Sequence, residues 1–255
     1  MWRVVGRVHD PELDEPVTDL GFVERAEVAN DGSVELDFRL PTFWCSPNFA
    51  FLMLDGVREA LESLSWRPRF HITLHDHLFA DDVNKGVAEG KPFSEIFDTL
   101  SPHEDLVELR DTFLRKAFQK RQEAALTGLR HAGWADDDIL TLDCGTLEKA
   151  RVGPELTVRL TRYLDAMRAR FPLGGDDALA FVTWEGAQLS PAELPDYLNR
   201  LRAVRINMEF NGALCRGLKK ARYREKATPD GELTLVEFID VDPGRCAGAS
   251  ASPRR

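Results

Sequence analysis

The sequence predicts an α+β protein, in which a small αββαβ domain of residues 1–100 precedes an α-rich domain of residues 101–246. Two observations predict the first domain: short segments in which apolar and polar residues alternate, and one stripe of apolar residues at helical spacing. Long helical patterns dominate the second half. Residues 247–255 are small and polar and can bury almost nothing, so we expect a disordered tail.

A hairpin is expected near the N-terminus, after a short first helix. Residues 22–28 have the composition of a strand, and residues 34–40 alternate between apolar and polar side chains with the period of a half-buried strand. Asp31-Gly32 lies between the two segments, and glycine accepts the positive φ that tight hairpin turns require. The two segments are therefore predicted to pair antiparallel.

A helix and a third strand should complete the first domain. Apolar residues recur at spacings of three or four from Phe51 to Leu64, which predicts a helix with one face on the sheet. Residues 70–74 alternate again and predict a strand that faces the same core. The predicted core consists of Val34, Leu36, Phe38, Leu54, Val57, Leu61, Ile72 and Leu74.

The second domain should begin after a polar stretch, residues 80–102, in which Phe93 and Phe97 suggest a short packed turn. Ser101-Pro102 has the composition of a helix start and predicts a helix to about residue 132. Further helices are expected at 154–170 and 191–223, and strands at 178–182 and 233–241.

Composition restricts the partners and the compartment. With 43 acidic and 33 basic residues, the chain has a formal charge of −10, which disfavours nucleic acid and anionic membranes as partners. The N-terminus lacks the apolar core of a secretory signal, and no apolar run approaches the roughly 20 residues that span a bilayer. We therefore expect a cytoplasmic protein whose four scattered cysteines are thiols.

Cys45 lies where the second strand should give way to the main helix. Ser46 is a suitable N-cap and Pro47 a suitable first helical residue. Unpaired N–H groups and the positive end of the helix dipole favour an anion there, so a thiolate should form more easily. The alternative is a buried loop cysteine between its aromatic neighbours.

Three motifs in this domain occur in order at compatible spacing: Asp10-Pro11-Glu12-Leu13, residues 17–23 and residues 42–47. Together they resemble the MIP18-like (DUF59) family of iron–sulfur cluster assembly factors. The resemblance implies a small α/β fold, a role in assembling or delivering metal–sulfur clusters, and a reactive cysteine at Cys45. Asp10, Asp19 and Thr42 are motif positions, although both aspartates could equally form turns or caps.

Histidines near the third strand offer a possible metal site. If the strand continues, His71, His75 and His77 share one face, because side chains alternate along a strand. His75 and His77 could then chelate one metal ion, with Cys45 on a neighbouring loop as a further ligand. A solvated sheet face is the alternative.

The second domain contains one more candidate site, within the helix predicted at 191–223. Asn211 and Cys215 are four residues apart and so share a helical face, and Arg216 could keep the thiol electropositive. The alternative is a buried helix in which Met208, Leu214 and Leu218 are packing residues. Cys144 and Cys246 have no comparable setting, and we assign them no role.

Together these features predict a maturation factor whose Cys45 transiently binds iron, an iron–sulfur cluster or persulfide sulfur. It would be a carrier that works with the cluster-assembly machinery, and residues 101–246 would recognise a client metalloprotein. Small members of the family are associated with oxygenases, which suggests an iron-dependent oxygenase as the client. The alternatives are a metal-dependent enzyme using His75 and His77, and an adaptor that only binds partners.

Overall fold

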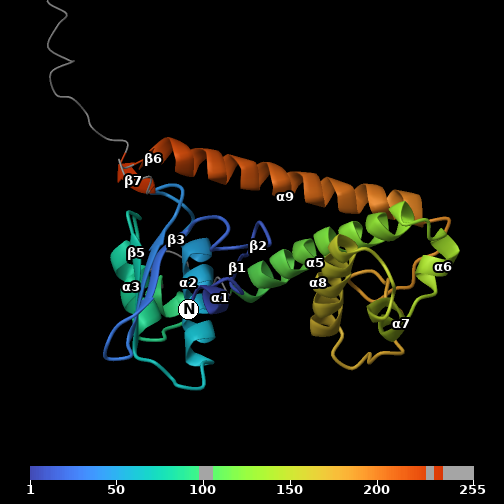
Figure 1. Cartoon of the computed structure of the whole chain (residues 1–255), viewed down its shortest axis with the longest axis horizontal. Helices are drawn as coiled ribbons and strands as arrows, with labels where there is room; N and C mark the ends of the chain where they lie inside the picture. The colour runs from blue at the N-terminus through green and yellow to red at the C-terminus, as the bar shows by residue number, and fades with distance from the viewer. Residues whose placement is uncertain (98–105, 228–232, 238–255) are drawn as a thin grey trace, which may run out of the picture.

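The protein has two lobes that are joined by two long helices (Figure 1). The structure, a computed structural model, describes residues 1–97, 106–227 and 233–237. The long helices, α5 (Leu106–His131) and α9 (Leu194–Arg222), pack against each other and contact both lobes. Strands occur in the first lobe and helices dominate the second, which confirms the predicted α+β class.

A three-stranded sheet forms one layer of the first lobe. Strands β3 (Val23–Val28) and β4 (Val34–Arg39) pair antiparallel, and β5 (Phe70–His75) lies parallel to β4. Gly32, in the turn between β3 and β4, has a φ of +81°, a conformation that glycine adopts without strain. The predicted hairpin is therefore confirmed.

Helices cover this sheet and complete the predicted αββαβ order. The main helix α2 (Pro47–Glu62) packs on β5, and the short helix α1 (Trp2–Val5) packs on α2. Two short antiparallel strands, β1 (His9–Asp10) and β2 (Glu15–Pro16), enclose the first motif. All eight residues of the predicted core are buried.

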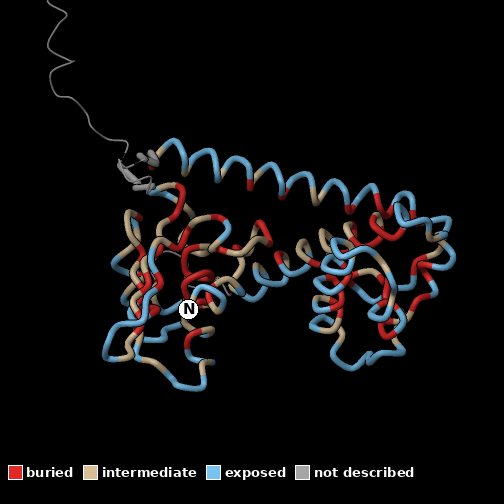
Figure 2. Tube along the Cα trace, viewed as in Figure 1, coloured by how far each residue is buried: buried red, intermediate tan, exposed pale blue. Residues whose placement is uncertain are grey.

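Two hydrophobic cores lie in the two lobes. The first gathers buried residues between Val5 and Leu106, and the second those between Phe118 and Leu201. Figure 2 shows these as separate groups of buried chain, and shows that the outer side of α9 is exposed along most of its length. The helix α5 contributes to both cores, so it couples the lobes mechanically.

The polar stretch after β5 contains more helix than the sequence predicts. Residues 80–88 form α3 (Ala80–Ala88), and the packed turn expected around Phe93 is the short helix α4 (Phe93–Ile96). Val83 and Val87 are four residues apart and both buried, so α3 is held by the core despite its polar composition.

In the second lobe, the prediction of a strand at residues 178–182 is wrong. This segment makes only single bridges, Asp143 to Leu179 and Val182 to Gln188. The predicted helices at 154–170 and 191–223 are confirmed as α8 (Pro154–Arg170) and α9. Two short helices, α6 (Asp136–Leu140) and α7 (Cys144–Glu148), complete this lobe.

The chain continues from α9 into β6 (Tyr223–Ala227), which pairs antiparallel with β7 (Leu233–Glu237). Four features of the sequence prediction lie outside the described residues. They are residues 238–241 of the last predicted strand, the predicted helix start Ser101-Pro102, Cys246, and the tail at 247–255. Among the helices that the structure describes, none is long and apolar enough to cross a membrane.

Candidate functional site

Cys45 lies on the loop that leads from β4 into α2. It comes two residues before Pro47, the first residue of α2, as the sequence predicts. The side chain is half-buried, and its Sγ lies 3.0 Å from the Oγ1 of Thr42. The preceding aromatic side chains point to solvent: Phe43 is 44% exposed and Trp44 is 74% exposed. The thiol therefore lies beside an exposed apolar surface.

His77, two residues after the end of β5, holds this loop in place by a hydrogen bond. Its Nε2 donates to the carbonyl oxygen of Cys45 at 2.8 Å, while its Nδ1 accepts the N–H of Phe79 at 3.2 Å. Burial lowers the pKa of His77, and the positive charge of Arg222 lowers it further. The ring is therefore neutral at pH 7, with both nitrogens bonded to the backbone.

The third strand does not continue as expected, so the three histidines do not share one face. The strand ends at His75, and Asp76 turns the chain with a φ of +49°. His71 is exposed, the Nε2 of His75 lies 3.0 Å from the Oδ1 of Asp37, and His77 is buried. Within the described residues, no group of three or more histidine, cysteine, aspartate and glutamate side chains could hold a metal ion.

Asp10 closes the turn between β1 and β2. Its Oδ1 accepts the N–H groups of Glu12 and Leu13, each at 2.9 Å. Burial raises the pKa of Asp10 to about 6, although the two backbone hydrogen bonds oppose this rise. Asp19 is exposed, and its carboxylate accepts a hydrogen bond from Thr18 at 3.3 Å. The geometry around Asp10 matches the turn-forming alternative.

Helix α9 reaches back from the second lobe to the first motif. The Nδ2 of Asn211 donates to Glu12 at 3.1 Å, and Arg216 pairs with Glu15 at 2.7 Å. Between these contacts, Cys215 packs against the core of the first lobe, as Cys45 does. The sequence placed Asn211 and Cys215 on one helical face, and both contact the first lobe.

The electrostatic setting of Cys215 differs from the expectation. Burial, together with the smaller effects of the charges of Asp10 and Cys45, raises its pKa to about 11. Arg216, which pairs with Glu15, lowers the pKa of Cys215 but is outweighed. The expected electropositive thiol is therefore wrong, and Cys215 is a protonated thiol at neutral pH.

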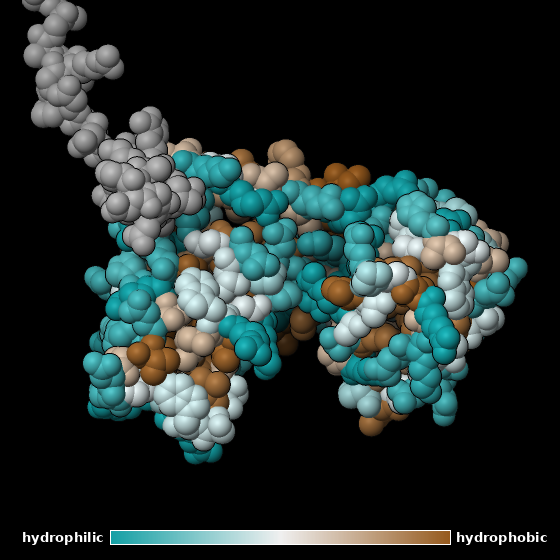
Figure 3. All heavy atoms as spheres, viewed as in Figure 1, coloured by the Kyte–Doolittle hydropathy of each residue, from teal (hydrophilic) through white to brown (hydrophobic). Residues whose placement is uncertain are grey.

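The exposure of α9 also differs from the alternative of a buried helix, in which Met208, Leu214 and Leu218 are packing residues. Met208 is buried as expected, but Leu214 and Leu218 are exposed. They continue a stripe, at every fourth residue, that begins with Ile206 and Phe210. Hydrophobic side chains follow the outer edge of α9 in Figure 3. We call these four residues the α9 stripe.

Asp14 is a buried charged position that sequence reasoning missed. It is buried with a φ of +53°, and its carboxylate lies 3.1 Å from the Nδ1 of His9 and 2.8 Å from the Nε of Arg121. Burial alone would raise the pKa of Asp14, but the hydrogen bonds from His9 and Arg121 outweigh it and lower the pKa. This carboxylate ties the first motif to α5.

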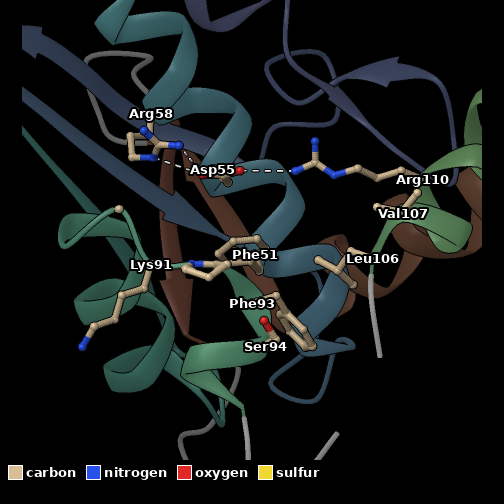
Figure 4. Close-up of a pocket in the computed structure, with 11 residues that line it drawn as sticks. Phe51, Asp55, Arg58, Lys91, Phe93, Ser94, Leu106, Val107 and Arg110 are labelled. Atoms are coloured by element: carbon tan, nitrogen blue, oxygen red, sulfur yellow. Dashed lines mark hydrogen bonds and ion pairs between the residues drawn. The ribbon is translucent and has the colours of Figure 1, made fainter. Parts of the chain in front are cut away.

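Two hollows lie near the site, and Cys45 lines neither. A cleft of about 820 Å³ lies between the lobes and includes Asp10 and Asp14 in its wall. A pocket of about 700 Å³ lies beside α2, where Asp55 is held between Arg58 and Arg110 (Figure 4). The Cys45 side chain is half-buried against the first core and lines neither hollow.

Comparison with known proteins identifies the first lobe. Residues 2–69 match the family model described as iron–sulfur cluster assembly protein. This match confirms the resemblance of the N-terminal domain to the MIP18-like family, and it supports a general role in iron–sulfur cluster assembly. No curated protein and no solved structure matches the chain.

Proposed function

We propose that this protein is a maturation factor in which Cys45 transiently binds iron or an iron–sulfur cluster and passes it to a client. The observation that carries the proposal is the position of Cys45 at the start of α2, half-buried, within the lobe that matches the assembly family. Thiolate is the ligand that iron–sulfur clusters select. The metal or cluster is the cargo of such a protein.

The setting of Cys45 fits a carrier better than a turnover enzyme. Small-molecule sites are usually concave, whereas Cys45 lines neither hollow described above and has exposed Phe43 and Trp44 beside it. Exposed aromatic side chains are frequent in contacts between proteins. We infer that a donor or a client docks over these aromatic residues in the cytoplasm.

Residues 101–246 would recognise the client, through the exposed side of α9. The four residues of the α9 stripe are between 39% and 66% exposed and follow one face of the helix, so they form a contiguous apolar surface of the kind that marks interaction sites. Helix α9 carries seven basic and two acidic residues in a chain of formal charge −10. A second copy would bring basic helices together, so we infer an acidic client surface, such as that of an iron-dependent oxygenase.

Replacement of the thiol tests the proposal. Cys45→Ser should leave the fold intact and abolish client maturation, because serine keeps the size of the side chain but not the soft sulfur ligand. Client activity and iron content would be measured in cells with each variant, alongside thermal melts of purified protein. Cys144→Ser and Cys246→Ser are the matched controls and should be nearly silent.

Two outcomes would reject this function. If Cys45→Ser unfolds the protein, the cysteine is structural; a folded variant that still matures its client would remove Cys45 from the mechanism. The metal-dependent enzyme considered above would instead hold stoichiometric metal and need His75 and His77. An adaptor would bind its partners without acquiring iron or sulfur.

A further inference from the structure

We propose that Arg222, in the last turn of α9, is a positioning residue for the loop that carries Cys45. It acts through Asp76 and His77, which follow the end of β5. The inference rests on the proposed function, because it takes Cys45 as the residue that binds the cargo. Its new element is that a helix far beyond the family match, which ends at residue 69, determines how the thiol is presented.

A chain of hydrogen bonds leads from the end of α9 to the Cys45 loop. The guanidinium group of Arg222 donates to the carbonyl oxygen of Asp76 at 3.0 Å. The next residue, His77, donates from its Nε2 to the carbonyl oxygen of Cys45 at 2.8 Å. Arg222 therefore binds the chain one residue before the side chain that holds the loop.

Asp76 sets the direction of the chain after β5. Its φ of +49° lies in the left-handed region, which is strained for a residue other than glycine and persists only where the surrounding structure holds it. Two arginines hold it here: Arg222 binds its carbonyl oxygen, and Arg39, the last residue of β4, pairs with its carboxylate. Without the Arg222 contact the turn can relax, and His77 would then move away from the carbonyl oxygen of Cys45.

The side chain of Arg222 is itself held by an aromatic ring. Its guanidinium group lies 5.0 Å from the centroid of the Tyr223 ring, and that of Arg39 lies 5.2 Å from the same centroid. Tyr223 is buried, and Arg39 also donates to Glu24 at 3.0 Å. A guanidinium group over a buried ring has lost much of its freedom, so Arg222 is preorganised to bind the carbonyl oxygen of Asp76.

The charge of Arg222 also reaches the ring of His77. Burial lowers the pKa of His77, and the positive charge of Arg222 lowers it further. The ring therefore stays neutral, so its Nδ1 can accept the N–H of Phe79 while its Nε2 donates to Cys45. Arg222 thus supports the position of His77 both through the backbone of Asp76 and through the charge state of the ring.

The same helix carries the α9 stripe, the surface proposed to meet the client. Leu218, the last residue of the stripe, lies one turn before Arg222, and Figure 1 shows this end of α9 over the first lobe. The client surface and the contact that holds the thiol loop are therefore on one rigid element. Loss of the Arg222 contact should slow transfer to the client although the stripe is intact.

Alkylation of Cys45 tests the proposal without a client. Full-length reduced protein is treated briefly with iodoacetamide, and peptide mass spectrometry measures the modification of each cysteine. Arg222→Met keeps the apolar stem but removes the guanidinium group, so Cys45 should react roughly tenfold faster, as expected when one hydrogen bond from a charged group is lost. Arg222→Lys keeps the charge and a donor, so its rate should stay within about threefold of wild type. Cys144, buried in the second lobe, should react at the wild-type rate in every variant.

Arg216→Met is the matched control. Arg216 also joins α9 to the first lobe, by its pair with Glu15 at 2.7 Å, so its removal should leave the alkylation rate of Cys45 unchanged. In the double variant with His77→Ala, Arg222→Met should add less than about twofold, because Arg222 acts through His77. An equal effect of Arg216→Met, or rates that multiply in the double variant, would overturn the proposal.

Hydrogen exchange of wild-type protein needs no variant. The amide of Tyr223 donates to the carbonyl oxygen of Lys219 at the end of α9, and the amide of Leu78 donates to that of Phe43 beside the thiol. If α9 positions the loop, both amides should exchange through one opening, with the same dependence on urea. A Leu78 amide that stays protected while the end of α9 opens would contradict the proposal, even if Arg222→Met does not fold.

The outcomes separate this inference from the proposed function. If Arg222→Met leaves the alkylation of Cys45 unchanged while Cys45→Ser abolishes client maturation, the positioning role is wrong and the proposed function stands. If Arg222→Met speeds alkylation but Cys45→Ser still matures its client, Arg222 holds the loop as inferred and the proposed function fails.

Discussion

The ring of His77 donates to the backbone carbonyl of Cys45 at 2.8 Å, so the residue that resembled a metal ligand instead holds the loop that carries the thiol. His77→Ala should therefore loosen this loop. Loss of a buried hydrogen bond costs about 1–3 kcal/mol. Urea unfolding should show that loss, and peptide mass spectrometry should show faster alkylation of Cys45. The exposed His71→Ala is the control, and equal alkylation rates in the two variants would contradict the assignment.

Asp10 should make stability depend on pH. Its pKa in the folded protein is about 6, above the ordinary value of 3.8. Between pH 4 and pH 6, therefore, Asp10 keeps its proton in the folded protein but has lost it in the unfolded chain. The stabilising contribution is present below pH 4 and declines as the pH rises to about 6, by at most about 3 kcal/mol. Asp10→Asn keeps the turn's acceptor oxygen without this titration.

The difference in the free energy of unfolding between Asp10→Asn and wild type should therefore grow in favour of the variant from pH 4 to pH 7. Chemical unfolding at a series of pH values measures it. Asp19→Asn, at an exposed motif position, provides the matched control. A difference that does not vary with pH would show that Asp10 ionises normally.

The buried carboxylate of Asp14 should couple the lobes. Asp14→Asn preserves the positive φ, which asparagine tolerates, but removes the charge that Arg121 and Arg162 face. Removal of one partner from a buried ion pair costs about 3–5 kcal/mol. Unfolding by urea should show this loss, with the two lobes unfolding in separate transitions. The exposed Asp111→Asn should be neutral, and equal stability of both variants would refute the coupling.

Local patterns predicted the first lobe well because its elements follow from short-range physics. Alternation predicted β4 and β5, the Asp31-Gly32 turn predicted the antiparallel pairing of β3 with β4, and Ser46-Pro47 placed Cys45 at the start of α2. The contact between Thr42 and Cys45 also lies within one loop. Such features depend on residues close together in the sequence.

Features that depend on long-range packing could not be predicted. Asp14 and Arg121 are 107 residues apart, and nothing in either segment indicates the other. Asp76 has a positive φ, which turns the chain so that His77 leaves the strand. Because this residue is not a glycine, the sequence does not mark the turn. Apolar spacing on α9 predicted packing at Leu214 and Leu218, but spacing alone does not show whether a surface is covered.

The α9 stripe should be needed for client recognition and dispensable for folding. Phe210→Asp places a charge on a side chain that is 66% exposed, so its effect on stability should stay within about 0.5 kcal/mol. Transfer of iron or a cluster to the client should fall, because the substitution disrupts the apolar contact and adds a negative charge facing an acidic partner. Wild-type transfer should also weaken as salt concentration rises.

Leu173→Asp is the control for this prediction, since Leu173 is almost fully exposed and belongs to the second lobe, just after the end of α8. Transfer rates and unfolding curves for both variants would be compared with wild type. Unchanged transfer in Phe210→Asp would refute the role of the stripe. If light scattering instead shows that wild type is a dimer and Phe210→Asp a monomer, the stripe binds a second copy of the chain, and the acidic client surface is rejected.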